Sequence, residues 1–189
     1  HAPPRDRYDE GRSQRDTVPL ESHVESNIGP KRVDPLTILQ KQNVDQNRVP
    51  ELIPLRFGRM SYSPFTYLRG AAAVQANDLA AGPRTDLWVE LCGDAHLGNF
   101  RWFNCPDRKP VFDLNDFDET LPGPFEWDVK RLAASITVAA RSNGFTPKKC
   151  RAATRSAMRE YRESISAASE LSPLDLFYYR FRSKCALAR

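Results

Sequence analysis

Pairs that join a capping residue to proline divide much of this chain into helical segments. Ser63-Pro64 supplies a helix N-cap followed by proline at the first helical position, and Gly82-Pro83 ends that segment. Between the two pairs, apolar residues recur at helical spacing on one face: Phe65, Leu68, Ala72, Ala76 and Leu79. We therefore predict a helix over residues 64–81, which leaves strands and loops only the intervals between such helices.

The same signals predict three more helices after residue 120. Pro124 opens the first and Gly144 closes it, with an apolar face made by Phe125, Val129, Leu132, Ala133, Ile136 and Ala140. Thr146-Pro147 begins the second, which extends to about Ser169. Ser172-Pro173 begins the last, whose apolar residues are Leu176, Phe177 and Phe181.

Two short apolar runs, at residues 87–91 and 110–114, predict β-strands. The loop of residues 92–100 follows the first strand, and an acidic turn follows the second. The order of elements is therefore helix, strand, acidic loop, strand, acidic loop and helices. This order predicts an α+β fold that is mostly helical, and it does not fit a sandwich or a Rossmann sheet.

Residues 1–50 differ in composition from the rest of the chain. They are rich in Pro, Arg, Asp, Glu, Ser and Gln, so we predict a disordered or weakly structured polar arm with a short helix around Pro35–Gln42. Residues 51–189 form the folded region. The 189 residues are 40% hydrophobic and contain no apolar run that could span a membrane or act as a signal peptide. These features predict a cytoplasmic protein with no membrane partner.

The net charge of +4 is unevenly distributed. Residues 51–140 carry nine Lys/Arg and twelve Asp/Glu, whereas residues 141–189 carry eleven and four. In the basic part Arg151, Arg155, Arg159 and Arg162 recur every three or four residues, which predicts a solvated helical stripe and leaves an anionic partner as the alternative. Nucleic acid is not the favoured partner.

The four cysteines form no C-x-x-C pair, so the sequence does not predict a zinc ribbon. Cys92, His96 and Cys105 lie near one another in sequence, but no fourth metal ligand is nearby. We interpret the cysteines as buried or incidental thiols.

The two acidic segments, residues 92–100 and 111–119, hold the residues that could do chemistry. Phosphoryl transfer requires a carboxylate that orients and deprotonates the attacking hydroxyl, and oxygen ligands for divalent metal ions. Asp94 and Asn99 have the separation of the catalytic Asp and the metal-binding Asn of kinases, and Asp116 follows the next strand. Such hard oxygen ligands suit Mg²⁺ or Mn²⁺.

These segments resemble two groups of proteins. Gly93-Asp94-Ala95-His96-Leu97-Gly98-Asn99 resembles the G-D-x-H-x-x-N loop of aminoglycoside phosphotransferase-like and choline kinase-like enzymes, and Asp116-Phe117-Asp118 resembles their D-x-D segment. Residues 56–144 more closely resemble a mostly bacterial group, the domain of unknown function 2252 family. The matching blocks include Arg59-Met60, Ser63-Pro64-Phe65, Leu68–Ala72, Phe112–Gly123 and Trp127–Ala133.

The kinase-like resemblance implies a role for each matched residue. Asp94 would be the catalytic base, Asn99 and Asp116 metal ligands, and Asp118 a second metal or water ligand. His96 would brace the loop and Asp128 would anchor it from the following helix. Asp113 is the alternative to Asp116 as a ligand, and Arg69 could reach a phosphate or a buried carboxylate.

The resemblance also implies a fold and a set of reactants. The fold would be the C-terminal catalytic lobe of a protein kinase-like enzyme. No glycine-rich loop or strand lysine precedes Asp94, so the expected arrangement is a fragment of a circularly permuted kinase, incomplete at its C-terminus. Cys92 stands where the related loops usually have His or Ser. ATP would be the co-substrate and Mg²⁺ or Mn²⁺ the metal.

Three functional hypotheses follow. The first is an ATP- and Mg²⁺-dependent phosphotransferase acting on a small hydroxyl-bearing molecule. The second is a non-catalytic, pseudokinase-like domain that binds metal or nucleotide. The third is a metal-dependent phosphoesterase that uses Asp113, Asp116 and Asp118. The acceptor, the nucleotide-binding residues and the oligomeric state are left open by the sequence.

Overall fold

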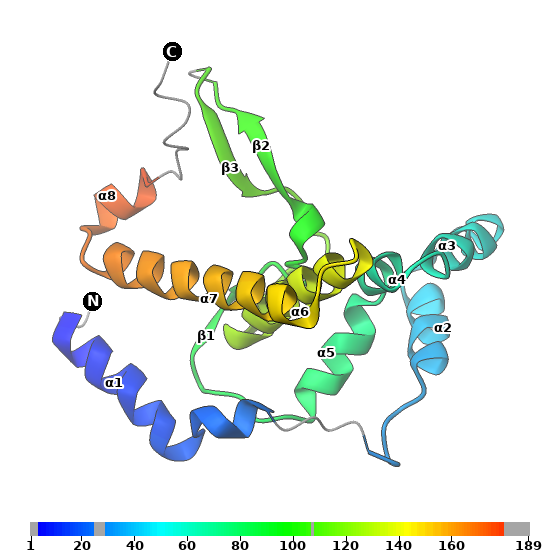
Figure 1. The fold of residues 1–189 in the computed structure, drawn as a ribbon, viewed down its shortest axis with the longest axis horizontal. Coiled ribbons are helices and arrows are strands. Elements are labelled where there is room, and N and C mark those ends of the chain that lie inside the picture. Colours follow the sequence, from blue (N-terminus) through cyan, green and yellow to red (C-terminus); the bar gives the residue numbers. More distant parts are fainter. Residues whose placement is uncertain (1–3, 25–28, 107, 180–189) are drawn as a thin grey trace.

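The computed structural model describes residues 4–24, 29–106 and 108–179 (Figure 1). The fold is α+β and mostly helical, with two small sheets, which confirms the predicted class at this level. The first half contains α1 (Pro4–Thr17), η1 (Leu20–Val24), α2 (Pro35–Asp45), η2 (Pro50–Leu52), α3 (Ile53–Met60), α4 (Pro64–Gly70) and α5 (Ala72–Ala80). The second contains β1 (Trp88–Leu91), η3 (Leu97–Asn99), β2 (Phe100–Asn104), β3 (Pro110–Leu114), β4 (Leu121–Pro124), α6 (Glu126–Ser142), α7 (Pro147–Ser169) and α8 (Pro173–Phe177).

The N-terminal segment is more helical than the sequence indicated. The short helix expected around Pro35–Gln42 is present as α2, and α1 and η1 also form within residues 1–50. In α1 nearly all described side chains are exposed, whereas α2 places the fully buried Leu39 in a cluster with Met60, Ala71 and Val74. Helix α2 therefore packs with the region that follows it, across the predicted boundary near residue 50.

The helix predicted over residues 64–81 is two helices, α4 and α5, separated at Ala71. Its start is as expected, because Ser63 caps α4 through a capping box and Pro64 occupies the first turn. At this break, two guanidinium groups donate hydrogen bonds to backbone carbonyl oxygens. Arg131 donates to the Leu68 oxygen, and Arg56 Nη2 donates to the Gly70 oxygen at 2.8 Å. Local apolar spacing could not reveal these two distant donors.

The predicted strands are present as β1 and β3, and two further strands pair with them. β1 pairs antiparallel with β4, and β2 pairs antiparallel with β3. The sequence did not predict β4, because its Leu-Pro-Gly-Pro run reads as a turn; a strand at a sheet edge tolerates such residues. β2 directly follows the acidic loop, and the β2–β3 hairpin projects away from the helical body (Figure 1).

Helices α6 and α7 form the long helical pair of the second half (Figure 1). Pro124 ends β4, so α6 begins at Glu126 instead of at the proline. It ends as predicted at Gly144, where φ is +73° and the N–H groups of Gly144 and Phe145 donate to the Arg141 and Ala140 carbonyls in a Schellman motif.

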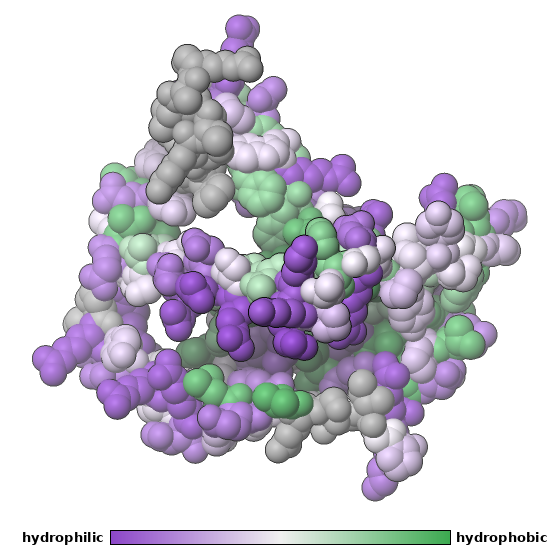
Figure 2. Space-filling view, in the orientation of Figure 1, coloured by the Kyte–Doolittle hydropathy of each residue, from purple (hydrophilic) through white to green (hydrophobic). Residues whose placement is uncertain are grey.

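Helix α7 confirms the helix predicted to run from Pro147 to about Ser169, and its basic stripe is exposed. All four stripe arginines have exposed side chains: Arg151, Arg155, Arg159 and Arg162. The surface over α7 is accordingly hydrophilic in Figure 2. The last predicted helix is present as α8, although Phe181 lies outside the described residues. Within the described ranges, no helix has both the length and the apolar character to cross a membrane.

Candidate functional site

The loop between β1 and η3 is fixed by a glycine at its start. Gly93 has a φ of +81°, in the left-handed region that side chains with a Cβ avoid. The backbone carbonyl of Glu119 also approaches Gly93 so closely that a Cβ there would collide with it. The turn before Asp94 is thus packed directly against the end of the second acidic segment.

Asp128, near the start of α6, contacts the same turn from the other side. Its carboxylate accepts hydrogen bonds from the backbone N–H groups of Cys92, at 2.7 Å, and Gly93, at 3.1 Å. Burial nevertheless raises the pKa of Asp128, and the two N–H donors act in the opposite direction. The kinase-like resemblance implied that Asp128 would anchor the loop from the following helix, and these two hydrogen bonds join Asp128 to the start of the loop.

His96 and Ser135 hold the remainder of the loop. His96 is 3% exposed, and its Nδ1 accepts a hydrogen bond from the Gly98 N–H at 3.0 Å. The Leu97 N–H donates to the Ser135 hydroxyl, which itself donates to the Leu132 carbonyl of α6. Burial lowers the pKa of His96, so the imidazole is neutral at pH 7 with its proton on Nε2.

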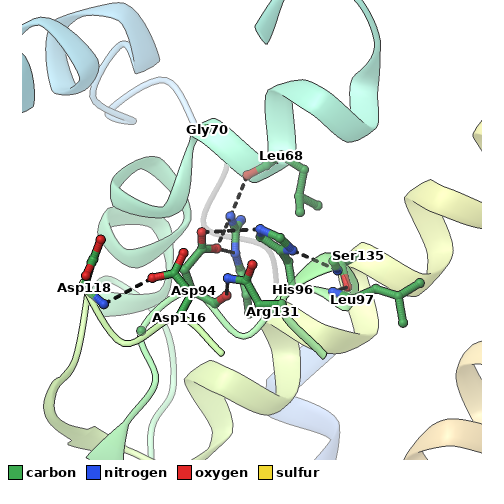
Figure 3. Close-up of polar contacts among 12 residues, drawn as sticks. Leu68, Gly70, Asp94, His96, Leu97, Asp116, Asp118, Arg131 and Ser135 are labelled. Carbon is green, nitrogen blue, oxygen red and sulfur yellow. Dashed lines mark hydrogen bonds and ion pairs between the residues drawn. The ribbon is translucent and has the colours of Figure 1, made fainter. Parts of the chain in front are cut away.

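Asp94 is held by Arg131 of α6 (Figure 3). Arg131 Nε and Nη2 lie 2.8 and 2.6 Å from Asp94 Oδ1, and His96 Nε2 lies 3.6 Å from Oδ2. Arg131 also donates to the Gln75 side chain at 2.7 Å and to the Leu68 carbonyl. One buried guanidinium therefore joins α4, α5 and the Asp94 loop.

Asn99 and Asp116 reach the same space as Asp94. The Asn99 Nδ2 donates to the backbone carbonyl of Asp94 at 3.0 Å, which leaves the amide oxygen without a hydrogen-bond partner among the described residues. Asp116 is exposed, and its Oδ1 accepts from the Asp118 N–H at 3.3 Å. Asn99 and Asp116 thus offer two hard oxygen donors beside Asp94.

Asp118 and Asp113 are not brought to that space. Both are exposed, and neither lines the cleft that Asp94, Asn99 and Asp116 share. Asp113 lies on β3 opposite Arg101 and accepts a hydrogen bond from the Leu114 N–H. Within the described ranges, no group of three or more His, Cys, Asp and Glu side chains is arranged to hold a metal ion.

The cleft has a volume of about 960 Å³ and is lined by both acidic and basic side chains. The two acidic segments contribute Asp94, His96, Asn99 and Asp116. Residues 48–70 contribute Arg69, which was predicted as a phosphate or carboxylate contact and lies beside Gly98, together with three arginines that the sequence analysis did not select: Arg48, Arg56 and Arg59. The apolar residues Leu52, Leu55 and Met60 also line the cleft.

Cys92 is buried beneath this site. It is 4% exposed, and its Sγ donates to the Asp116 carbonyl at 3.2 Å. Burial raises the pKa of the Cys92 thiol, and the nearby carboxylates act in the same direction. The thiol therefore links the turn before Asp94 to the segment that carries Asp116.

Residues 48–188 match the sequence profile of a family described as uncharacterised proteins conserved in bacteria, DUF2252. The chain belongs to this family. The match contains the whole cleft, from Arg48 to Asp116, as well as Asp128 and Arg131. Neither a curated protein nor a solved structure matches the chain.

Besides the three cleft arginines, the sequence analysis of this DUF2252 chain did not select Arg131 as a site residue. It lies one position before Leu132 in the apolar pattern of α6, so helical periodicity assigns it to the edge of the buried face. Together with Glu126 and Ser135 it is among the most buried residues of α6. A charged residue at the edge of an apolar helical face is the signal that could have indicated a buried carboxylate partner.

Proposed function

We propose that this chain is the catalytic part of an ATP- and Mg²⁺-dependent phosphotransferase that acts on a small hydroxyl-bearing molecule, in a kinase-like lobe. The observation that carries the proposal is the grouping of Asp94, Asn99 and Asp116 in one open cleft. Phosphoryl transfer depends mostly on positioning and charge stabilisation, so a few well-held oxygen groups suffice.

The oxygen donors of the site fit a magnesium ion. Mg²⁺ is usually held by one or two carboxylates together with waters and substrate phosphates, so it does not require a complete cage of protein ligands. The Asp116 carboxylate is exposed to the cleft, and the hydrogen bond from Asn99 Nδ2 to Asp94 directs the amide oxygen away from that carbonyl. A bound metal would neutralise phosphate charge during transfer.

Asp94 is the proposed base. Its Oδ1 is engaged by Arg131, while Oδ2 lies near the neutral His96 at 3.6 Å. The residue remains 15% exposed in the cleft, so an acceptor hydroxyl can approach the carboxylate. Because the transition state of phosphoryl transfer is loose, the carboxylate needs only to orient the hydroxyl and take its proton late.

The ion pair with Arg131 also favours a second candidate function, a pseudokinase-like domain that binds metal and nucleotide without transfer. A buried guanidinium on Oδ1 serves to hold Asp94 and its loop in place whether or not catalysis occurs. The two candidates predict the same ligands and differ only in turnover.

Ligand-dependent thermal unfolding tests the site. With Mn²⁺ and ATP at about 100 times the dissociation constant, the parent should gain about 2.7 kcal/mol, a rise in Tm of roughly 5–10 °C. Asp116→Ala should lose this rise. Asp113→Ala, an exposed carboxylate outside the cleft, is the matched control and should keep it. No rise in the folded parent, or equal loss in both variants, would overturn the proposed metal–nucleotide site.

Turnover then separates the two candidates. ATP consumption is measured with pools of small alcohols, sugars and amino alcohols as acceptors. Asp94→Asn should abolish acceptor-dependent consumption while the thermal shift with Mn²⁺ and ATP persists. A thermal shift with no turnover in the parent would favour the binding domain, and unchanged turnover in Asp94→Asn would exclude Asp94 as the base.

A further inference from the structure

The cleft that contains Asp94 is also lined by a group of arginines. We call Arg48, Arg56, Arg59 and Arg69 the arginine wall. Arg48 precedes η2, Arg56 and Arg59 belong to α3, and Arg69 belongs to α4. Helices α3 and α4 lie next to each other (Figure 1), and the four arginines line one concave surface although they are spread over the sequence.

Two arginines of the wall, Arg56 and Arg48, donate hydrogen bonds only to uncharged groups. Arg56 donates to Asn43 Oδ1 at 2.8 Å, to Gln42 Oε1 at 3.0 Å and to the Gly70 carbonyl at 2.8 Å. Arg48 donates from Nη2 to Gln46 Oε1 at 2.6 Å, while its Nε is buried without a hydrogen-bond partner. Both guanidinium groups are thus held in place, and neither charge is neutralised by a contact.

The other two arginines of the wall, Arg59 and Arg69, are exposed. Within the described parts of the chain, neither side chain makes a hydrogen bond or an ion pair. Other arginines of the molecule do find carboxylates: Arg32 forms two hydrogen bonds to Asp78, at 2.8 and 2.7 Å.

Uncompensated cations around a concave surface attract anions. Burial lowers the pKa of Arg56, and the charge of Arg48 lowers it further, against a smaller opposing effect of Glu119. An anion between these groups would relieve their mutual repulsion. Guanidinium groups present planar, forked donors that match the oxygens of a phosphate group, and the buried Arg48 Nε is a donor that still lacks an acceptor.

We infer that the arginine wall binds a phosphate group of the ligand that occupies the cleft. The inference rests on the proposed function only for the claim that this ligand is a reactant. The phosphate could belong to the nucleotide or to an acceptor that is itself phosphorylated. The arginine wall lines the same cleft as Asp94 and Asp116, so a molecule held by its phosphate would lie beside the proposed base and metal ligands.

Pyrophosphate, titrated calorimetrically into the chain without any metal, tests the wall directly. The double variant Arg59→Gln/Arg69→Gln removes two charges from exposed side chains that make no hydrogen bond or ion pair among the described residues, so it should fold like the parent. Its affinity for pyrophosphate should fall by at least about tenfold. The control Arg155→Gln/Arg159→Gln removes two exposed charges from α7 and should change affinity less than about twofold.

The outcomes separate cleanly. No measurable binding by the parent, equal affinity in the cleft variant, or an equal loss in the α7 control would each overturn the inference. Competition with pyrophosphate identifies the source of the phosphate. If glycerol phosphate displaces pyrophosphate and Mg²⁺–ATP does not, the wall binds a phosphorylated acceptor. If Mg²⁺–ATP displaces pyrophosphate, the wall binds the nucleotide.

The test is also independent of the proposed function. Asp94→Asn should retain pyrophosphate binding even if no acceptor is ever phosphorylated, because this substitution removes no cation from the cleft. If the parent transfers phosphate but the arginine variant binds pyrophosphate normally, the proposed function stands and the phosphate-binding wall is wrong.

Discussion

In the ion pair between Asp94 and Arg131, the arginine is the more deeply buried member. The Arg131 side chain is 3% exposed and that of Asp94 is 15% exposed. The carboxylate therefore faces the cleft while its cation comes from the interior, where it also binds Gln75 and the Leu68 carbonyl. The guanidinium that holds the proposed base thus also binds a carbonyl at the break between α4 and α5.

Replacing Arg131 should affect folding as well as the site. Arg131→Gln leaves the Asp94 carboxylate and the Leu68 carbonyl without their donor, and loss of one partner of a buried pair costs about 3–5 kcal/mol. Urea unfolding should show this loss. Arg155→Gln, on the exposed face of α7, should change the free energy of unfolding by no more than about 0.5 kcal/mol. A loss of similar size in both variants would contradict the structural role of Arg131.

Gly93 and Gly144 form a matched pair for testing how tightly the loop packs. Both have positive φ, +81° and +73°, so alanine at either position should cost about 1–2 kcal/mol in backbone strain. Only Gly93 also faces a close backbone carbonyl, that of Glu119, whereas Gly144 has open space around it. Urea unfolding should therefore show a larger loss for Gly93→Ala than for Gly144→Ala. Equal losses would mean that the loop can move away from Glu119.

Stability should depend on pH through His96. Burial holds its pKa below the ordinary value of 6.5, and the positive charges of Arg131 and Arg69 act in the same direction, against Asp94. Below pH 6.5 the unfolded chain binds a proton that the folded chain does not, so stability is lost as pH falls from about 7 towards the lowered pKa, by up to about 1.4 kcal/mol per pH unit.

The control for this dependence is His96→Asn. Its amide oxygen can accept the Gly98 N–H in place of Nδ1, but it does not titrate. Thermal or urea unfolding between pH 5 and 7.5 should show a smaller slope in the variant than in the parent. Identical slopes would assign the pH dependence to other groups.

The fold could be predicted from sequence where local signals act alone. The capping pairs located the starts of α4 and α7, and the apolar runs located β1 and β3. The prolines concealed β4, because its pairing with β1 depends on residues 30 or more positions away. The division of residues 64–81 into two helices likewise depends on Arg56 and Arg131, which lie outside that segment.

In the site too, the residues of a local sequence motif could be predicted, whereas those that only the fold brings together could not. Asp94, Asn99 and Asp116 stand in a recognisable loop pattern, and the structure places them along one cleft. The arginine wall combines Arg48, which precedes η2, with arginines of two short helices, α3 and α4, and each of these arginines is an ordinary exposed or half-buried residue when considered alone. Only the packing of α3 and α4 against the Asp94 loop gives these arginines a common surface.

The Cys92 thiol should be protected from alkylating and disulfide reagents in the folded chain. Only the thiolate is nucleophilic, and burial both raises the pKa of Cys92 and leaves it 4% exposed. Cys105, half-buried on the β2–β3 side of the molecule, is the internal comparison. Peptide mapping after timed reaction at pH 8 should show modification of Cys92 slower than that of Cys105 by about tenfold or more. In denaturing urea the two should react at similar rates, and fast reaction of Cys92 in the folded chain would show that the turn before Asp94 opens readily.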